Sequence, residues 1–68
     1  MTVREGDRVR LLQDVVGIMG NRVPAGTVGT IVDDVNAPGQ YAVDVRVDDA
    51  YDNVAVTPEQ FEELGRTP

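Results

Sequence analysis

The sequence predicts an all-β domain whose five strands curl into a small barrel, with a short helical turn near the C-terminus. The first observation is the stretch 23–35, in which Pro24 and Gly26 are typical of a tight turn and the following run is rich in β-branched side chains. The second is Gly29 inside that run, because a glycine within a strand marks a bulge, a sharp bend or a close backbone approach. The third is the alternation of apolar and polar residues through 40–48, which is the period of a strand with one buried side.

Two strands are predicted directly from this alternation. Over 7–12, Val9 and Leu11 alternate with arginines, so the two apolar side chains face the interior and the arginines face solvent. Over 40–48, Tyr41 and the valines at every second position share one side, and polar residues take most of the other. Both strands are therefore expected to be half-buried.

The last third of the chain predicts an acidic turn, a short strand over 54–56 and then one or two turns of helix. Thr57 can cap this helix, the proline that follows suits the first helical position, and Gln60 can complete a capping box. Phe61 and Leu64 are three apart and would share one helical face, and the next glycine would end the helix. We expect this helical turn to plug the open end of the barrel.

The expected core draws side chains from every element. In the central strand, 27–35, the placement of a bulge at Gly29 decides whether Ile31 or Val32 points inward, and the residues leave both open. The core residues that we expect are Val9, Leu11, Val28, Ile31, Val43, Val45, Val54, Val56, Phe61 and Leu64.

The segment 13–22 is predicted to be a loop, because Gly17 and Gly20 disfavour a helix and the segment is too long for a tight hairpin turn. Its apolar residues are Val15, Val16, Ile18 and Met19. Two interpretations stay open: two of the four tuck under the loop as satellite core, or the loop forms an apolar, partly exposed binding tip. Since a core this small cannot easily bury all four, Ile18 and Met19 are the residues expected to be exposed.

Composition bounds the function. The 68 residues are expected to form one domain, 1–68, with frayed ends at 1–3 and 66–68, and a core that supplies only about 3–5 kcal/mol. Cysteine and histidine are absent, which removes disulfides, thiolate ligands and the commonest general base.

The net charge of −6 repels phosphate backbones. No apolar run is long enough for a signal peptide or a membrane span, so a cytoplasmic location without membrane contact is expected.

Few residues suggest chemistry. Four carboxylates lie close together in the sequence: Asp44, Asp48, Asp49 and Asp52. Calcium takes several carboxylate oxygens, but the acidic turn 48–53 lacks the spacing of an EF-hand, and solvated turn carboxylates are the simpler interpretation. The turn at Gly26 lacks the lysine and the helix of a phosphate-binding loop. We therefore expect no catalytic residues, no cofactor and no metal ligands.

Four stretches, in order, carry a resemblance to a known fold family. They are Gly6-Asp7-Arg8-Val9-Arg10, Gly26-Thr27-Val28-Gly29-Thr30-Ile31-Val32, Tyr41-Ala42-Val43 and Pro58-Glu59-Gln60-Phe61-Glu62-Glu63-Leu64. Together they resemble the small bacterial SH3-like barrels, which include the barrel of the nitrile hydratase β subunit, that of a photosystem I accessory subunit and stand-alone domains of uncharacterised families. The resemblance covers 6–64 and implies a five-stranded SH3-like barrel. It implies no single function, because such barrels host unrelated activities.

Two functions stay open. The first is a non-catalytic protein-interaction or accessory module that binds through the long loop and a neighbouring turn. Its expected contact residues are Val16, Ile18, Met19 and Tyr51. An acidic rim would favour a protein partner with a basic surface. The chain itself is expected to be a monomer or a weak homo-oligomer.

The alternative is nucleic-acid binding of the transcription-elongation (KOW) type through an arginine face. The arginines that could form it are Arg4, Arg8, Arg10, Arg22 and Arg46. The few aromatic residues make a base-stacking platform a poor expectation, and the acidic net charge opposes binding to phosphates.

Overall fold

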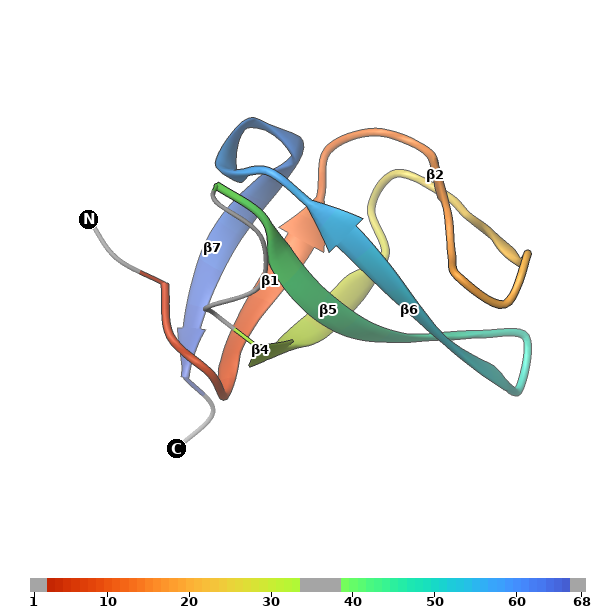
Figure 1. Cartoon of the computed structure of the whole chain (residues 1–68), viewed down its shortest axis with the longest axis horizontal. Helices are drawn as coiled ribbons and strands as arrows, with labels where there is room; N and C mark the ends of the chain where they lie inside the picture. Colours follow the sequence, from red (N-terminus) through yellow and green to blue (C-terminus); the bar gives the residue numbers. More distant parts are fainter. Residues whose placement is uncertain (1–2, 34–38, 67–68) are drawn as a thin grey trace.

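A computed structural model describes residues 3–33 and 39–66, and strands make up most of this part of the chain (Figure 1). The strands are β1 (Asp7–Leu11), β2 (Val15–Val16), β3 (Arg22–Val23), β4 (Val28–Asp33), β5 (Tyr41–Val47), β6 (Ala50–Val56) and β7 (Phe61–Arg66). One turn of 3₁₀-helix, η1 (Pro58–Gln60), joins β6 to β7. The all-β class predicted from the sequence is confirmed.

Five of the strands form one antiparallel sheet in the order β6-β5-β4-β1-β7. The sheet curls strongly (Figure 1), but it is not a closed barrel, because β6 and β7 remain its two edges. β2 and β3 form a separate small hairpin. The predicted number of strands in the sheet is correct, but the fifth strand is β7, from a segment in which the sequence predicted helix.

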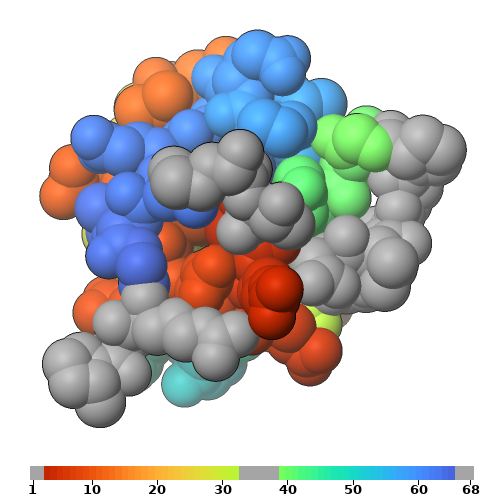
Figure 2. All heavy atoms as spheres, turned by 90° about the vertical axis from the view of Figure 1, so that its left-hand side faces the viewer, coloured from red at the N-terminus to blue at the C-terminus, as the bar shows by residue number. Residues whose placement is uncertain are grey.

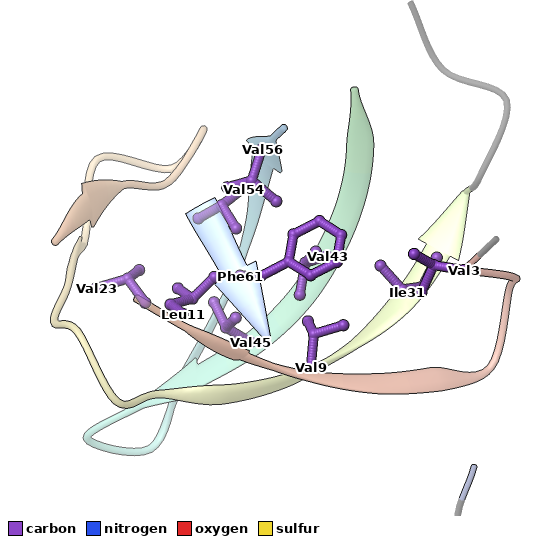
Figure 3. Packing of buried hydrophobic residues seen from close by; sticks show 10 residues of the cluster. All are labelled: Val3, Val9, Leu11, Val23, Ile31, Val43, Val45, Val54, Val56 and Phe61. Carbon is purple, nitrogen blue, oxygen red and sulfur yellow. The ribbon is translucent and has the colours of Figure 1, made fainter. Parts of the chain in front are cut away.

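The hydrophobic core lies between the curled strands (Figure 3). Its buried residues are Val3, Val9, Leu11, Val23, Ile31, Val43, Val45, Val54, Val56 and Phe61. All except Val3 and Val23 are predicted by the sequence, whereas the prediction of Val28 is wrong because this residue is only half-buried.

The ends of the described chain are more ordered than the sequence suggests. Val3 lies in a segment expected to fray, yet it is buried in the core. Figure 2 shows this side of the molecule, where the first described residues (red) lie beside β7 (blue). Arg66, also expected to fray, is the last residue of β7 and pairs with Asp7. The expectation therefore fails at Val3 and Arg66, whereas the other residues expected to fray, 1–2 and 67–68, lie outside the described part of the chain.

Gly29 marks a close backbone approach rather than the expected bulge. Its φ is not positive, but a β-carbon placed on it would lie 2.6 Å from the backbone carbonyl oxygen of Asp44 and 2.6 Å from a methyl carbon of Val43. The bulge lies further on, where the pairing of β4 with β5 shifts directly after Ile31. The extra residue is Val32, which is exposed, so Ile31 points inward and is fully buried.

The helix predicted after Thr57 is replaced by the single turn η1 and the strand β7. The predicted capping contact is present, since the backbone N–H of Thr57 donates to Oε1 of Gln60 at 2.8 Å. β7 then begins at Phe61, which pairs with Leu11 on the edge of β1 and is buried. Pairing with β1 and the burial of Phe61 stabilise a strand here more than a helix too short to be stable alone would be stabilised. Leu64 is the extra residue of a bulge against β1 and is 41% exposed, so its predicted core position is wrong.

A two-residue turn, rather than a long acidic turn, joins β5 to β6. Asp48 and Asp49 have φ values of 49° and 68°, the conformation of a type I′ turn, which aspartate tolerates better than most residues. The short strand predicted over 54–56 is therefore only the last part of β6. Because side chains alternate along a strand, exposed Tyr51 and buried Asp52 point to opposite sides of β6.

Candidate functional site

The hairpin of β2 and β3 carries residues 17–21, which we call the tip. The backbone N–H of Gly17 donates to the carbonyl oxygen of Asn21 at 2.9 Å, and the N–H of Gly20 donates to the carbonyl oxygen of Gly17 at 3.0 Å. Gly20 has a φ of 91°, which a residue with a side chain rarely adopts. The glycines that disfavoured a helix in the sequence therefore close a compact turn.

The tip is bound to the edge of β6. The backbone N–H of Ile18 donates to the carbonyl oxygen of Asn53 at 2.8 Å, a bond of the kind that a neighbouring strand would make. The tip and the β5–β6 hairpin accordingly lie on the same side of the molecule (Figure 1). Because an exposed strand edge invites pairing with other chains, the backbone of the tip protects part of this edge.

Asp52 holds the tip in place. It is only 3% exposed, and its Oδ1 accepts hydrogen bonds from the backbone N–H groups of Met19 at 2.9 Å and Asn53 at 2.7 Å. Its Oδ2 accepts from the backbone N–H and the side-chain Nδ2 of Asn21, at 3.1 and 3.0 Å. Burial by itself raises the pKa of Asp52, but these hydrogen bonds outweigh it and hold the pKa below its ordinary value.

The tip is consequently expected to loosen only in acid. Since the pKa of Asp52 is lower in the folded than in the unfolded chain, its charged form stabilises the fold above the unfolded-state pKa of about 3.9. This contribution is lost as the pH falls through the lower folded-state pKa. We expect the NMR amide shifts of Met19 and Asn21 to stay constant from neutral pH to about 4 and to change below it. A transition of these amides centred at higher pH would contradict the assignment.

Three apolar side chains of this hairpin are exposed although the tip backbone is fixed. The exposed fractions are 68% for Val16, 76% for Ile18 and 72% for Met19. Val15, the fourth apolar residue of the predicted loop, packs partly buried against the core. The satellite-core interpretation therefore applies to one of the four residues, and the exposed-tip interpretation applies to the other three.

Tyr51, on β6, precedes Asp52 and is 66% exposed. The guanidinium carbon of Arg46, which lies opposite on β5, is 5.5 Å from the centre of the Tyr51 ring, and Arg46 also binds the carboxylate of Asp49 at 3.0 Å. Met19 is hydrogen-bonded to Asp52, the residue next to Tyr51, but the side chain of Tyr51 points to the side of β6 opposite to that of Asp52. The candidate site, which we call the tip patch, therefore consists of Val16, Ile18 and Met19, and the predicted contact residue Tyr51 lies outside it.

The four carboxylates that are close in the sequence do not converge. Asp52 is turned towards the tip, whereas Asp44 is exposed on the other side of the sheet. Asp48 and Asp49 form the β5–β6 turn. Within 3–33 and 39–66, no group of three acidic residues is placed so that it could hold a metal ion.

The arginines of the alternative site are divided between strands. Exposed Arg8 and Arg10 lie on β1 and Arg46 lies on β5, with β4 between these two strands. Arg10 binds Glu62 at 2.8 Å, and Arg46 binds Asp49. Two of these three cations therefore already have carboxylate partners.

Asp52 is the residue that sequence reasoning misses, because in the sequence it stands beside the turn carboxylates Asp48 and Asp49. A signal was present in the alternation of β6, since counting back by two from Val56 and Val54 reaches Asp52 and places it inward. An inward carboxylate needs hydrogen-bond donors, and a loop bracketed by glycines can bring backbone N–H groups close to it.

Neither a pocket nor a helix able to cross a membrane is present in the part of the chain that the structure describes. Comparisons with protein-family models, with curated proteins and with solved structures found no match to this chain. The interpretation of the site therefore depends on its own geometry.

Proposed function

We propose that this chain is a non-catalytic protein-interaction module that binds its partner through the tip patch. The observation that carries the proposal is the combination of exposure and order at the tip. Val16, Ile18 and Met19 remain exposed, while hydrogen bonds to β6 fix the backbone of Ile18 and Met19, and pairing with β3 fixes that of Val16. A surface that is already ordered loses little conformational entropy on binding, and exposed apolar side chains supply the contact area.

We further propose that the fold is an SH3-like barrel of the kind that the sequence resembles. The curled five-stranded antiparallel sheet and the 3₁₀ turn before the last strand support this proposal. A fold of this type carries no particular activity, so the function is argued from the tip patch alone.

The partner is a protein with a basic surface. The chain has a net charge of −6, and the exposed carboxylates of Asp48 and Asp49 lie in the turn that leads into β6, the strand to which the tip is hydrogen-bonded. Methionine adapts to different partner surfaces because its side chain is flexible and polarizable, which suits Met19 to a contact role. Acidic groups beside an apolar contact steer a basic partner towards it and disfavour acidic ones.

The test compares Ile18→Asp/Met19→Asp with the wild type in selection from a displayed library of random peptides. Because both side chains are exposed, the double variant should melt within a few degrees of the wild type. It should no longer capture the peptides that the wild type selects, and those peptides should combine apolar residues with Lys or Arg. The matched control is Leu12→Asp/Leu64→Asp, which adds the same two charges at exposed apolar residues outside the tip patch.

Three results would contradict the proposal. Equal capture by the wild type and by Ile18→Asp/Met19→Asp would remove the tip patch as the contact surface. Unfolding of this double variant, with the control intact, would show that its residues serve the fold. Binding of nucleic acid at micromolar concentration that weakens steeply with salt would favour the arginine alternative instead.

A further inference from the structure

The tip makes few bonds within itself and several to β6. Inside the tip, two backbone hydrogen bonds close the turn at Gly17. Towards β6, the backbone N–H of Ile18 reaches Asn53, and Asp52 accepts from Met19 and from both the backbone and the side chain of Asn21. The position of Ile18 and Met19 relative to the sheet therefore depends on the contacts with β6, and most of these end on one carboxylate.

We propose that Asp52 is the positioning residue of the tip patch: it touches no partner itself, but it holds Ile18 and Met19 in the arrangement that binds. This role rests on the proposed function, because it concerns the same patch. Asp52 is buried, so a partner protein meets the side chains that it orders and not its carboxylate.

A carboxylate is the side chain that this position requires. Four N–H groups point at its two oxygens, and an ionised carboxylate is an acceptor only, with about four lone-pair sites. An asparagine at this position would offer one acceptor oxygen and would bring its own N–H₂ group against donors. A buried donor without an acceptor is costly, so the tip would move away to hydrogen-bond with water.

Gly17 is the second residue on which the position of the tip depends. A β-carbon on Gly17 would overlap the carboxylate of Asp52, so only glycine allows the tip backbone to approach this closely. The base of the hairpin is held differently, because Val23 is buried in the core and Val15 packs against it. Loss of the Asp52 contacts should therefore release the tip and leave the base of the hairpin in place.

The test uses Asp52→Asn with Asp44→Asn as the matched control. Both variants remove one negative charge from the β5–β6 pair, but Asp44 is exposed and makes no contact with the tip in the described structure. In Asp52→Asn we expect amide hydrogen exchange at Met19 and Asn21 to become at least roughly tenfold faster, while Val43 and Val54 remain the slowest amides. Asp44→Asn should exchange like the wild type.

The second measurement is the affinity for a peptide selected by the wild type, taken well below the melting temperature of each variant. Asp52→Asn should bind roughly tenfold more weakly or worse, because the peptide must then order the tip. A merely structural residue would lower the melting temperature without changing this affinity. If Asp52→Asn does not fold, Asn21→Ala serves instead, since it removes only the side-chain donor and should give a smaller shift in the same direction.

The outcomes separate the two proposals. Faster exchange at the tip with unchanged peptide affinity would overturn the positioning role and leave the proposed function standing. Unchanged exchange at Met19 and Asn21 would overturn the positioning role outright. If the wild type selects no peptide that Ile18→Asp/Met19→Asp loses, the proposed function is wrong, and the positioning role is wrong with it.

Discussion

Gly29→Val is expected to remove most of the stability of the domain. A β-carbon at this position would lie 2.6 Å from the backbone oxygen of Asp44 and 2.8 Å from a methyl carbon of Val45. The backbone oxygen belongs to the neighbouring strand of the sheet, so it cannot move aside as a flexible side chain could. Overpacking of this kind costs about 3 kcal/mol or more, which is most of the stability that a single small core supplies.

The measurement is a denaturant titration of Gly29→Val beside Thr30→Val. The control changes the next residue of β4, whose side chain points to the other side of the sheet, and it places the same β-branched residue there. It should fold with nearly wild-type stability because valine favours strands. A wild-type transition midpoint for Gly29→Val would show that the sheet is not curled tightly at this position.

Phe61→Ala is expected to destabilise the domain by about 3–5 kcal/mol, whereas Leu64→Ala should cost less than about 1 kcal/mol. Phe61 is buried and its ring meets that of Tyr41 edge-on at 5.8 Å between ring centres. Leu64 is 41% exposed and lies at a bulge. If a helix followed Thr57, the two residues would share one buried face and both variants would lose much stability. The difference between the two losses therefore distinguishes a strand from a helix.

Thermal unfolding of the two variants makes the comparison. The strand β7 predicts a large loss for Phe61→Ala and a small one for Leu64→Ala. Similar large losses for both would mean that Leu64 is also buried, as a helix would require, and would contradict the pairing of β7 with β1.

The elements that the sequence predicts best are those with strict alternation. Val9 and Leu11 in β1, and Val43 and Val45 in β5, are buried as expected, because a period of two specifies both the strand and its inward side. β7 was missed because its stability comes from pairing with β1, which is distant in the sequence. The helix signals at Thr57 are real, but they extend over only one turn.

The candidate site was predictable in part. The exposure of Ile18 and Met19 follows from their position between glycines and from the small size of the core. The role of Asp52 could not be derived from composition. The N–H groups that donate to its carboxylate lie in a loop more than thirty residues earlier in the chain. Local patterns show which residues face inward, but they do not show which distant N–H groups a buried carboxylate will meet.

The most direct measurement of the binding surface is an NMR titration of the isotope-labelled chain with a peptide selected by the wild type. The proposed function predicts that the largest shift changes occur at the amides of the tip patch, Val16, Ile18 and Met19. The largest changes at Arg8, Arg10 and Thr30, on the outer side of β1 and β4, would contradict it and would place the contact on the arginine strands instead.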